Sequence, residues 1–279
     1  MQQFNDRPEL MPYVRALEGR NNQTRGNEVL KALELLGIVP AIQECYRPRI
    51  RNIIVDFQPG ADVNLPVFCA HYDAVKGSPG AADNASGVAV LLGLCREMPR
   101  KGVPLRIIFF DREEAWLRTP LLRLGLLGSW YYARRVDLKR VTAVYNLESC
   151  GTGDSLALWP VRRRGKPLPA VVMVTKAAQQ LDMHILTAHV PWYLLSSDHQ
   201  SFRWCGLENA ISLSMFPARE EPVFTSILGS GGLGRMLRDR SGLPEPLCSI
   251  HTAADTSDRL SEGSLQAVLS LLIKVLEGP

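Results

Sequence analysis

Residues 71–87 read HYDAVKGSPGAADNASG, and the rest of the chain is organised around this stretch. It follows the apolar run Leu65 to Ala70, which is typical of a strand buried on both faces. The stretch opens with His71 and Asp73, contains three glycines, and brings Asp83 to the start of another apolar run. A strand ending in His-x-Asp, then a turn, then an aspartate at the mouth of a helix, is a good arrangement for binding a metal ion.

The apolar residues on either side of this stretch alternate between strand-like runs and helical spacing. Strands are expected over residues 51–57, 65–70, 105–110, 141–147, 155–159 and 209–215, and helices within 8–37 and over 87–99, 128–135, 168–181 and 264–276. This alternation predicts one α/β domain over residues 1–279, with a central, mostly parallel mixed sheet and helices on both faces. Residues 216–247 are rich in glycine and proline, and we expect a long loop or a partly ordered insertion over the site.

Composition and charge exclude several classes of protein. With 46% hydrophobic and 22% charged residues, the chain is expected to be globular rather than disordered. The formal net charge of +4 comes from scattered basic residues, and the run Arg162 to Arg164 has no interleaved aromatics. We therefore expect no nucleic-acid partner.

We also expect neither a membrane span nor a secretory signal peptide. No apolar run approaches the ~18–20 residues that a membrane helix needs. Residues 1–20 carry charges and prolines where a signal peptide would have its apolar segment. The six cysteines are dispersed without a CxxC pair, which favours reduced, buried packing thiols. We expect a cytoplasmic protein without a membrane partner.

Acceptor side chains follow three of the expected strands. His71, the pair Glu113-Glu114, and Glu148 each come directly after an apolar run. Ligands of open α/β sheets bind at the carboxyl ends of the strands, so these side chains should meet at one edge. Carboxylates gathered there would repel one another unless a cation held them. Imidazole with carboxylate and no thiolate suits zinc, with manganese or cobalt as substitutes.

This donor set suggests a hydrolytic metal site. One histidine with two carboxylates makes an open zinc site, and two such sets that share a carboxylate make a two-metal site. The adjacent pair Glu113-Glu114 fits a division of labour in which one glutamate binds metal and its neighbour takes a proton from water.

Seven short motifs, in order, resemble those of the M28 family of zinc aminopeptidases. They are HYD at 71–73, GAADNASG at 80–87, FDREE at 110–114, GLLGS at 125–129, NLE at 146–148, SDHQSF at 197–202 and HTAADT at 251–256. The resemblance implies the single-domain fold of zinc exopeptidases, two zinc ions (or one), and a peptide substrate with a free N-terminus.

The resemblance also implies a role for each matching residue. His71 and Glu148 would bind one zinc ion, and Glu114 and His251 the other, with Asp83 bridging both. Two further residues would act without binding metal: Asp73 would orient the first histidine ligand, and Glu113 would be the general base.

The chain departs from the family pattern at three places. Glu148 stands where the family most often has aspartate, so its longer arm must be accommodated. Residues 115–124 are inserted after the Glu-Glu pair, as also occurs in the related glutaminyl cyclases. Ile250 stands where some relatives have a tyrosine that hydrogen-bonds the oxyanion, which leaves Tyr193 or Tyr72 as the candidates here.

We expect an aminopeptidase that removes the N-terminal residue of peptides. One alternative is an acyltransferase of the glutaminyl cyclase type with one zinc ion. Another is a catalytically silent metal-binding protein, although the intact Glu113-Glu114 pair argues against it. Asp198 and His199 are expected to line or brace the pocket, and Asp255 to serve a turn or a helix cap.

Overall fold

A computed structural model describes residues 7–47, 49–58, 64–114, 117–118, 123–160, 162–163, 166–187, 196–229 and 243–278. In these residues eight strands form one sheet, in the order β1-β2-β4-β3-β7-β12-β8-β11. Their bounds are β1 Ala41–Cys45, β2 Ile50–Phe57, β3 Leu65–His71, β4 Leu105–Phe110, β7 Val141–Leu147, β8 Ser155–Trp159, β11 His184–Thr187 and β12 Ala210–Phe216.

The centre of the sheet is parallel and its flanks are mixed. β4, β3, β7 and β12 run parallel to one another, whereas β2 is antiparallel to both β1 and β4, and β8 is antiparallel to β12. β3 lies inside the sheet and is buried along almost its whole length, as its continuous apolar run predicts. The expected α/β fold with a mixed, largely parallel sheet is confirmed.

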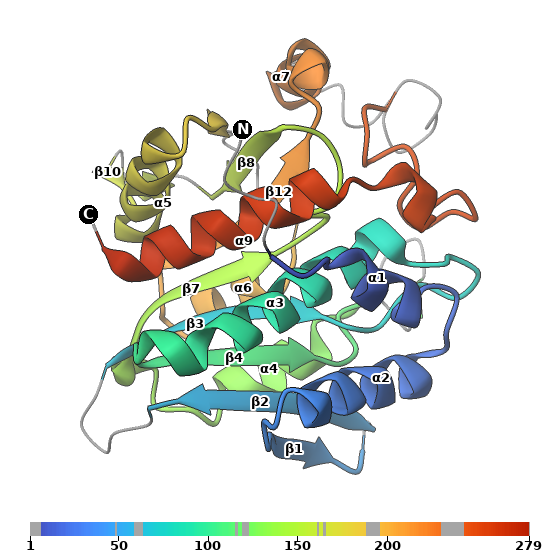
Figure 1. The fold of residues 1–279 in the computed structure, drawn as a ribbon, viewed down its shortest axis with the longest axis vertical. Helices are drawn as coiled ribbons and strands as arrows, with labels where there is room; N and C mark the ends of the chain where they lie inside the picture. Colours follow the sequence, from blue (N-terminus) through green and yellow to red (C-terminus); the bar gives the residue numbers. More distant parts are fainter. Residues whose placement is uncertain are drawn as a thin grey trace.

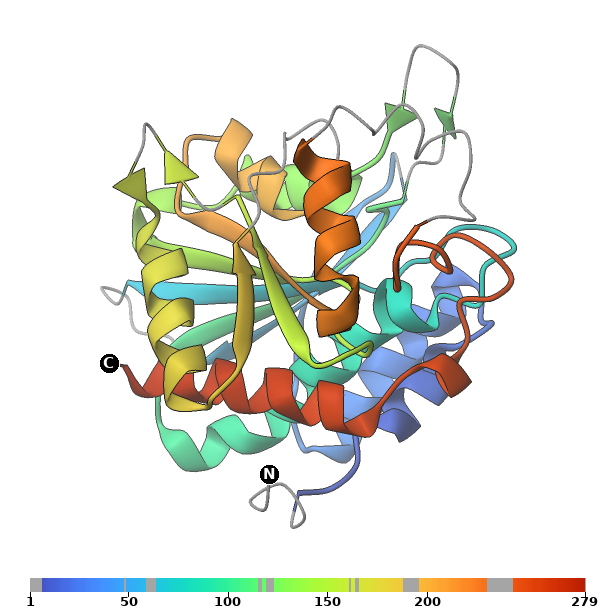
Figure 2. The ribbon, with the colours of Figure 1, turned by 90° about the horizontal axis from the view of Figure 1, so that it is seen from above.

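Helices cover both faces of this sheet (Figures 1 and 2). One face carries α1 Met11–Leu17, α2 Asn22–Leu35, α3 Ser86–Lys101, α5 Pro169–Gln180 and α9 Glu262–Glu277. The other face carries α4 Leu127–Ala133 and α6 His199–Trp204, whose apolar residues form a separate cluster. α3 packs between α1 and α9 directly over the central strands, which places its N-terminus beside the carboxyl ends of β3 and β7.

Several boundaries differ from the sequence prediction. β1 and β11 were not predicted, because they are short strands at the two edges of the sheet and β1 has little apolar patterning. α3 does not end at Pro99 but continues to Lys101, where Gly102 takes a left-handed conformation with φ of +63°. Pro99 therefore lies inside the last turn of α3 and does not end the helix.

The two insertions are partly described. Residues 218–229 are not a loop: they form a 3-10 turn at Ala218–Glu220 and the helix α7 at Glu221–Gly229, whereas 230–242 lie outside the described residues. This favours the partly ordered insertion among the two expectations. After the Glu-Glu pair, β5 Leu117–Arg118 and β6 Arg123–Leu124 pair antiparallel, and residues 115–116 and 119–122 lie outside the described residues.

All six cysteines are free, and three of them are buried. None of the described helices has the length and apolar character needed to cross a membrane.

Candidate metal centre

The chain topology gathers the five expected ligands at the carboxyl edge of the sheet. His71 ends β3, Glu114 follows the neighbouring strand β4, and Glu148 follows β7 on the other side. Asp83 lies in the turn Ala81–Ala85 that leads into α3, and His251 lies in the segment before α9. Because β4, β3 and β7 are parallel neighbours, their last residues reach the same place.

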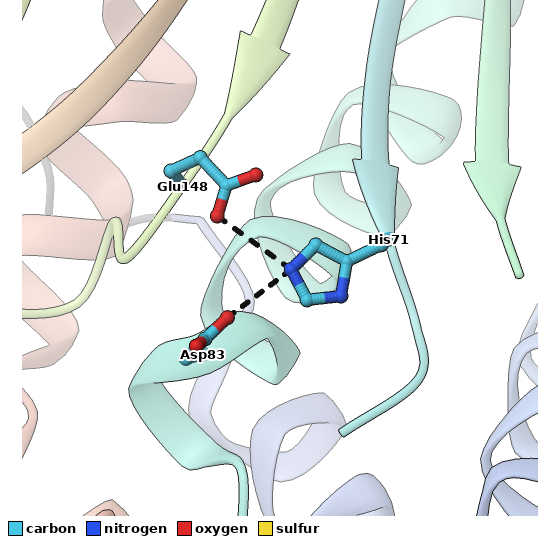
Figure 3. A group of neighbouring side chains, drawn as sticks. All are labelled: His71, Asp83 and Glu148. Carbon is cyan, nitrogen blue, oxygen red and sulfur yellow. Dashed lines mark ion pairs between the residues drawn. The ribbon is translucent and has the colours of Figure 1, made fainter. Parts of the chain in front are cut away.

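Three of these side chains form one group of donors (Figure 3). His71 Nε2 lies 3.1 Å from Asp83 Oδ1 and 3.6 Å from Glu148 Oε2. A tetrahedral zinc ion with ligands at ~2.1 Å separates its donor atoms by roughly 3.4 Å. The spacing of this group therefore fits a zinc ion bound by one imidazole and two carboxylates.

A second group uses the other oxygen of the same aspartate. His251 Nε2 lies 2.8 Å from Asp83 Oδ2 and 2.9 Å from Glu114 Oε1. The backbone of His251 has a φ of +62°, a conformation that residues other than glycine seldom adopt and that is found at functional sites. Asp83 thus offers one oxygen to each group, which is the arrangement of a carboxylate that bridges two ions.

Electrostatics of the site favour a cation. Asp83, Glu113 and Glu114 are 7%, 8% and 6% exposed, respectively. Burial opposes the charge of Asp83, but hydrogen bonds from His251 and His71 lower its pKa well below the usual value. Burial alone would lower the pKa of His251, and its contacts with Asp83 and Glu114 raise it to about 9. In the metal-free protein, bound protons thus supply the positive charge that an ion would bring.

Asp73 connects the first histidine with the glutamate pair. Its Oδ1 lies 3.4 Å from His71 Nδ1, and its carbonyl oxygen lies 3.1 Å from the same nitrogen. The same carboxylate accepts the backbone N–H groups of Glu113, at 3.0 Å, and Glu114, at 3.1 Å. The first contact suits the orienting role expected for Asp73, and the second was not anticipated from the sequence.

The environment of Glu148 accommodates its longer side chain. Its Oε1 accepts hydrogen bonds from Asn146 Nδ2, at 3.0 Å, and from the Ser197 hydroxyl. This leaves Oε2 facing His71. The two donors hold the carboxylate in one orientation, so the extra methylene does not leave the ligand free to swing.

Asp255, for which we expected only a turn or helix-cap role, supports the backbone at Asp83. Asp255 accepts the backbone N–H groups of Ala82, at 2.6 Å, and Asp83, at 3.2 Å. It thereby fixes the turn that carries the bridging ligand, rather than only capping a local turn. Its place four residues after His251 was the only sequence signal for this contact.

Residues 52–276 match the sequence profile of peptidase family M28. The chain belongs to this family. Aminopeptidase YwaD of Bacillus subtilis is 34% identical over 161 residues, which cover 54% of this chain and 32% of that protein. The uncharacterised protein YfbL of Escherichia coli is 36% identical over 38% of this chain and 34% of its own length. The chain therefore spans about a third of the length of these curated relatives.

Solved structures with this fold include both peptidases and cyclases. BSAP, a zinc aminopeptidase from Bacillus subtilis, superposes with a TM-score of 0.58 at 25% identity over 81% of this chain and 49% of that one. Glutaminyl cyclase of Porphyromonas gingivalis superposes with a TM-score of 0.70 at 19% identity over 96% of both chains. The second likeness shows the fold alone.

In this M28 chain the expected base, Glu113, lies in the buried part of the centre. Burial raises the pKa of Glu113 well above its usual value, and the charges of Glu114, Glu148 and Asp198 act in the same direction. Asp198 is itself fully buried, which raises its pKa to about 7. Neighbouring His199 bonds through Nδ1 to Ser212 Oγ at 2.7 Å, which is consistent with a bracing role.

Of the two candidates for the oxyanion donor, only Tyr72 lies within the described residues. The Tyr72 hydroxyl donates to the carbonyl of Arg51 at 2.8 Å and is thus directed away from the ligands. The suggestion that Tyr72 could serve is therefore wrong: its ring packs in the core beside Gly26 of α2. Tyr193 lies outside the described residues.

Proposed function

We propose that this M28 protein is a metal-dependent aminopeptidase that hydrolyses the N-terminal residue of peptides. The observation that carries the proposal is the pair of donor groups joined through the two oxygens of Asp83. Each group contains one imidazole nitrogen and carboxylate oxygens, which is the donor chemistry of hydrolytic zinc sites. Glu113 lies directly before the ligand Glu114, with both backbone amides held by one carboxylate.

Zinc, when bound, supplies a Lewis acid for the peptide carbonyl and lowers the pKa of water. The chain's own contribution is proton transfer and binding. The Glu113 carboxylate takes a proton from the attacking water and passes it to the amine of the leaving peptide, a role helped by a raised pKa. The acidic side chains around the ions suit the free, positively charged amine of the substrate.

A glutaminyl cyclase is the second candidate. The observations in its favour are the hairpin inserted after Glu114 and the fold shared with the Porphyromonas gingivalis enzyme. Both donor groups are complete here, however, and a one-zinc cyclase needs only one of them. The third candidate, a silent metal-binding protein, has no use for a buried carboxylate at Glu113.

We further propose that the substrate is a peptide in the cytoplasm and that neither nucleic acid nor a membrane takes part. The scattered basic residues and the dispersed, free cysteines support this setting.

One set of assays separates the candidates. Zinc is measured by mass spectrometry on the purified protein, and a panel of aminoacyl anilides and a Gln-peptide cyclisation assay are run with and without chelator. About two zinc ions with chelator-sensitive hydrolysis supports the peptidase. About one zinc ion with cyclisation supports the cyclase, and zinc without either reaction supports the silent protein.

The base is tested by Glu113→Gln, which keeps the shape of the side chain and removes proton acceptance. We expect hydrolysis to fall about 10²–10⁴-fold with zinc content unchanged. Glu97→Gln on α3 is the matched control, since Glu97 lies outside both donor groups. If Glu113→Gln hydrolyses as fast as the parent, the assignment of the base is wrong.

A further inference from the structure

Arg25 on α2 is completely buried, close enough to the metal centre for its charge to interact with those of Asp73 and Asp83. Its guanidinium donates to the carbonyl oxygens of Tyr72, Leu17 at 3.0 Å, Pro79 at 3.3 Å and Gly80 at 3.1 Å. Within the described part of the chain, these backbone oxygens are its hydrogen-bond partners, and no carboxylate pairs with it. A buried charged group whose partners are all carbonyl oxygens needs several such hydrogen bonds to offset the free-energy cost of losing its water.

Two of these carbonyls mark the ends of the segment that separates the ligands His71 and Asp83. Tyr72 directly follows the first ligand, and Gly80 lies three residues before the second. We call residues 72–80 the ligand loop. By bonding both ends, the guanidinium fixes the span of the loop, because its planar fork presents donors in fixed directions.

Other contacts of the ligand loop come from the same part of the chain. Asn22 Oδ1, also on α2, accepts the backbone N–H of Ala74 at 3.1 Å. Gly80 has a φ of +69°, and a β-carbon there would lie 2.7 Å from that of Ala74 and 3.0 Å from Arg25 Nη1. The loop therefore packs closely against the guanidinium at Gly80, where a side chain would collide with Ala74 and Arg25.

The guanidinium also brings a positive charge close to the acidic ligands. Burial lowers the pKa of Arg25 to about 10, and the charges of Asp73, Asp83 and Asp255 act in the opposite direction. Arg25 therefore remains charged at neutral pH. This charge stabilises the metal-free cluster but repels an incoming ion, so charge alone would weaken metal binding.

We propose that Arg25 is a positioning residue for the metal centre, one that holds the ligand loop so that His71 and Asp83 face each other before an ion binds. The proposal rests on the proposed metal site but not on the reaction. The affinity of His71 and Asp83 for a metal ion then depends on α2 as well as on the edge of the sheet.

The test separates positioning from charge. Arg25→Lys keeps the charge but cannot reach four carbonyls, and Arg25→Met removes the charge as well. Arg106→Lys is the matched control: Arg106 makes a fork to Asp56, at 2.5 and 2.8 Å, and bonds the Tyr132 hydroxyl, near the opposite end of β4. The full chain is stripped of metal, and zinc affinity is measured by competition with a chromophoric chelator.

We expect Arg25→Lys to weaken zinc affinity about tenfold or more, with faster hydrogen exchange of the ligand loop in the metal-free protein. Arg106→Lys should leave zinc affinity within about twofold of the parent. If Arg25 acted through charge alone, Arg25→Lys would bind like the parent and Arg25→Met more tightly. Parental zinc affinity in Arg25→Lys, with or without lower stability, overturns the proposal.

A measurement on the parent protein covers the case in which the variants do not fold. In the metal-free parent, the N–H groups of Tyr72 and Ala74 should already be protected from exchange, because their hydrogen bonds are in place without an ion. Free exchange there overturns the proposal. Zinc binding as expected without hydrolysis would contradict only the proposed aminopeptidase activity.

Discussion

His251 Nε2 lies 2.8 Å from Asp83 Oδ2, so the last histidine of the site contacts the oxygen of the bridging aspartate that faces away from His71. In the metal-free protein this contact is an ion pair in a buried place, with the side chain of Asp83 8% exposed and that of His251 18%. A proton on the imidazole therefore offsets the negative charge of Asp83, as a metal ion would. The proton and the ion compete for the same imidazole nitrogen.

The stability of the metal-free protein should fall as pH rises from about 6.5 to about 9. The pKa of His251 is about 9 in the folded chain against 6.5 when unfolded. Because the folded state binds the extra proton, its stabilisation is complete below pH 6.5 and lost above 9. We expect a loss of about 1–3 kcal/mol, measured by denaturant unfolding of the chelator-treated protein at fixed ionic strength. Asp198, with a pKa of about 7, adds a fall in the same direction between pH ~4 and 7.

His251→Gln is the control for this prediction, since glutamine still donates a hydrogen bond but does not titrate. Its metal-free form should lose much less stability over the same pH range. A metal-free parent that becomes more stable between pH 6.5 and 9 would contradict the ion pair. Zinc affinity of the parent should rise with pH, because binding displaces the proton.

Removal of the hydroxyl that holds Glu148 should weaken metal binding. In Ser197→Ala the Oε1 atom of Glu148 keeps Asn146 as a donor but loses the serine. Residues that orient a metal ligand are typically worth 10–100-fold in affinity, so we expect about tenfold weaker binding of one zinc ion. Stepwise zinc titration measures this, because the site formed by Glu114 and His251 should keep its affinity.

Ser155→Ala provides the comparison, since Ser155 is also buried and its hydroxyl contacts His184 on β11. That variant should bind both ions like the parent. Equal losses in Ser155→Ala and Ser197→Ala would show a general loss of stability rather than a disturbed ligand. Glu148→Asp should also reduce occupancy, because its shorter arm cannot reach both Ser197 and the position facing His71.

The charge of Asp198 should set part of the pH dependence of hydrolysis. Asp198 is among the charges that raise the pKa of Glu113, so Asp198→Asn should lower that pKa. A base works in its deprotonated form, and the acid limb of kcat/KM should therefore move to lower pH, by about 0.5–1 unit. The pH–rate profile measures this shift. Asp182→Asn, in an exposed turn, should leave the profile unchanged, and a shift to higher pH in Asp198→Asn would refute the coupling.

The central elements could be predicted because each carries its own pattern. β4, β7 and β8 have the bounds that their apolar runs indicate. The positions of His71 and Glu148 after strands were enough to infer that they meet, because parallel strands share a carboxyl edge. Elements with weak patterns were missed, namely the edge strands β1 and β11 and the helix α7, whose region is rich in glycine and proline.

The sequence alone determined the fold class, the ligand types and the edge at which they gather, since apolar periodicity and motif order are local properties of the chain. Tertiary structure decided how the ligands are held. Asp255 accepts a backbone N–H of the Asp83 turn, and Arg25 donates to backbone carbonyls of the ligand loop, in both cases far away along the chain. Every residue except proline has the same backbone N–H and C=O groups, so the sequence does not indicate which side chain will bond to them. Only the folded chain shows that one buried guanidinium bonds both ends of the segment from which the metal centre is built.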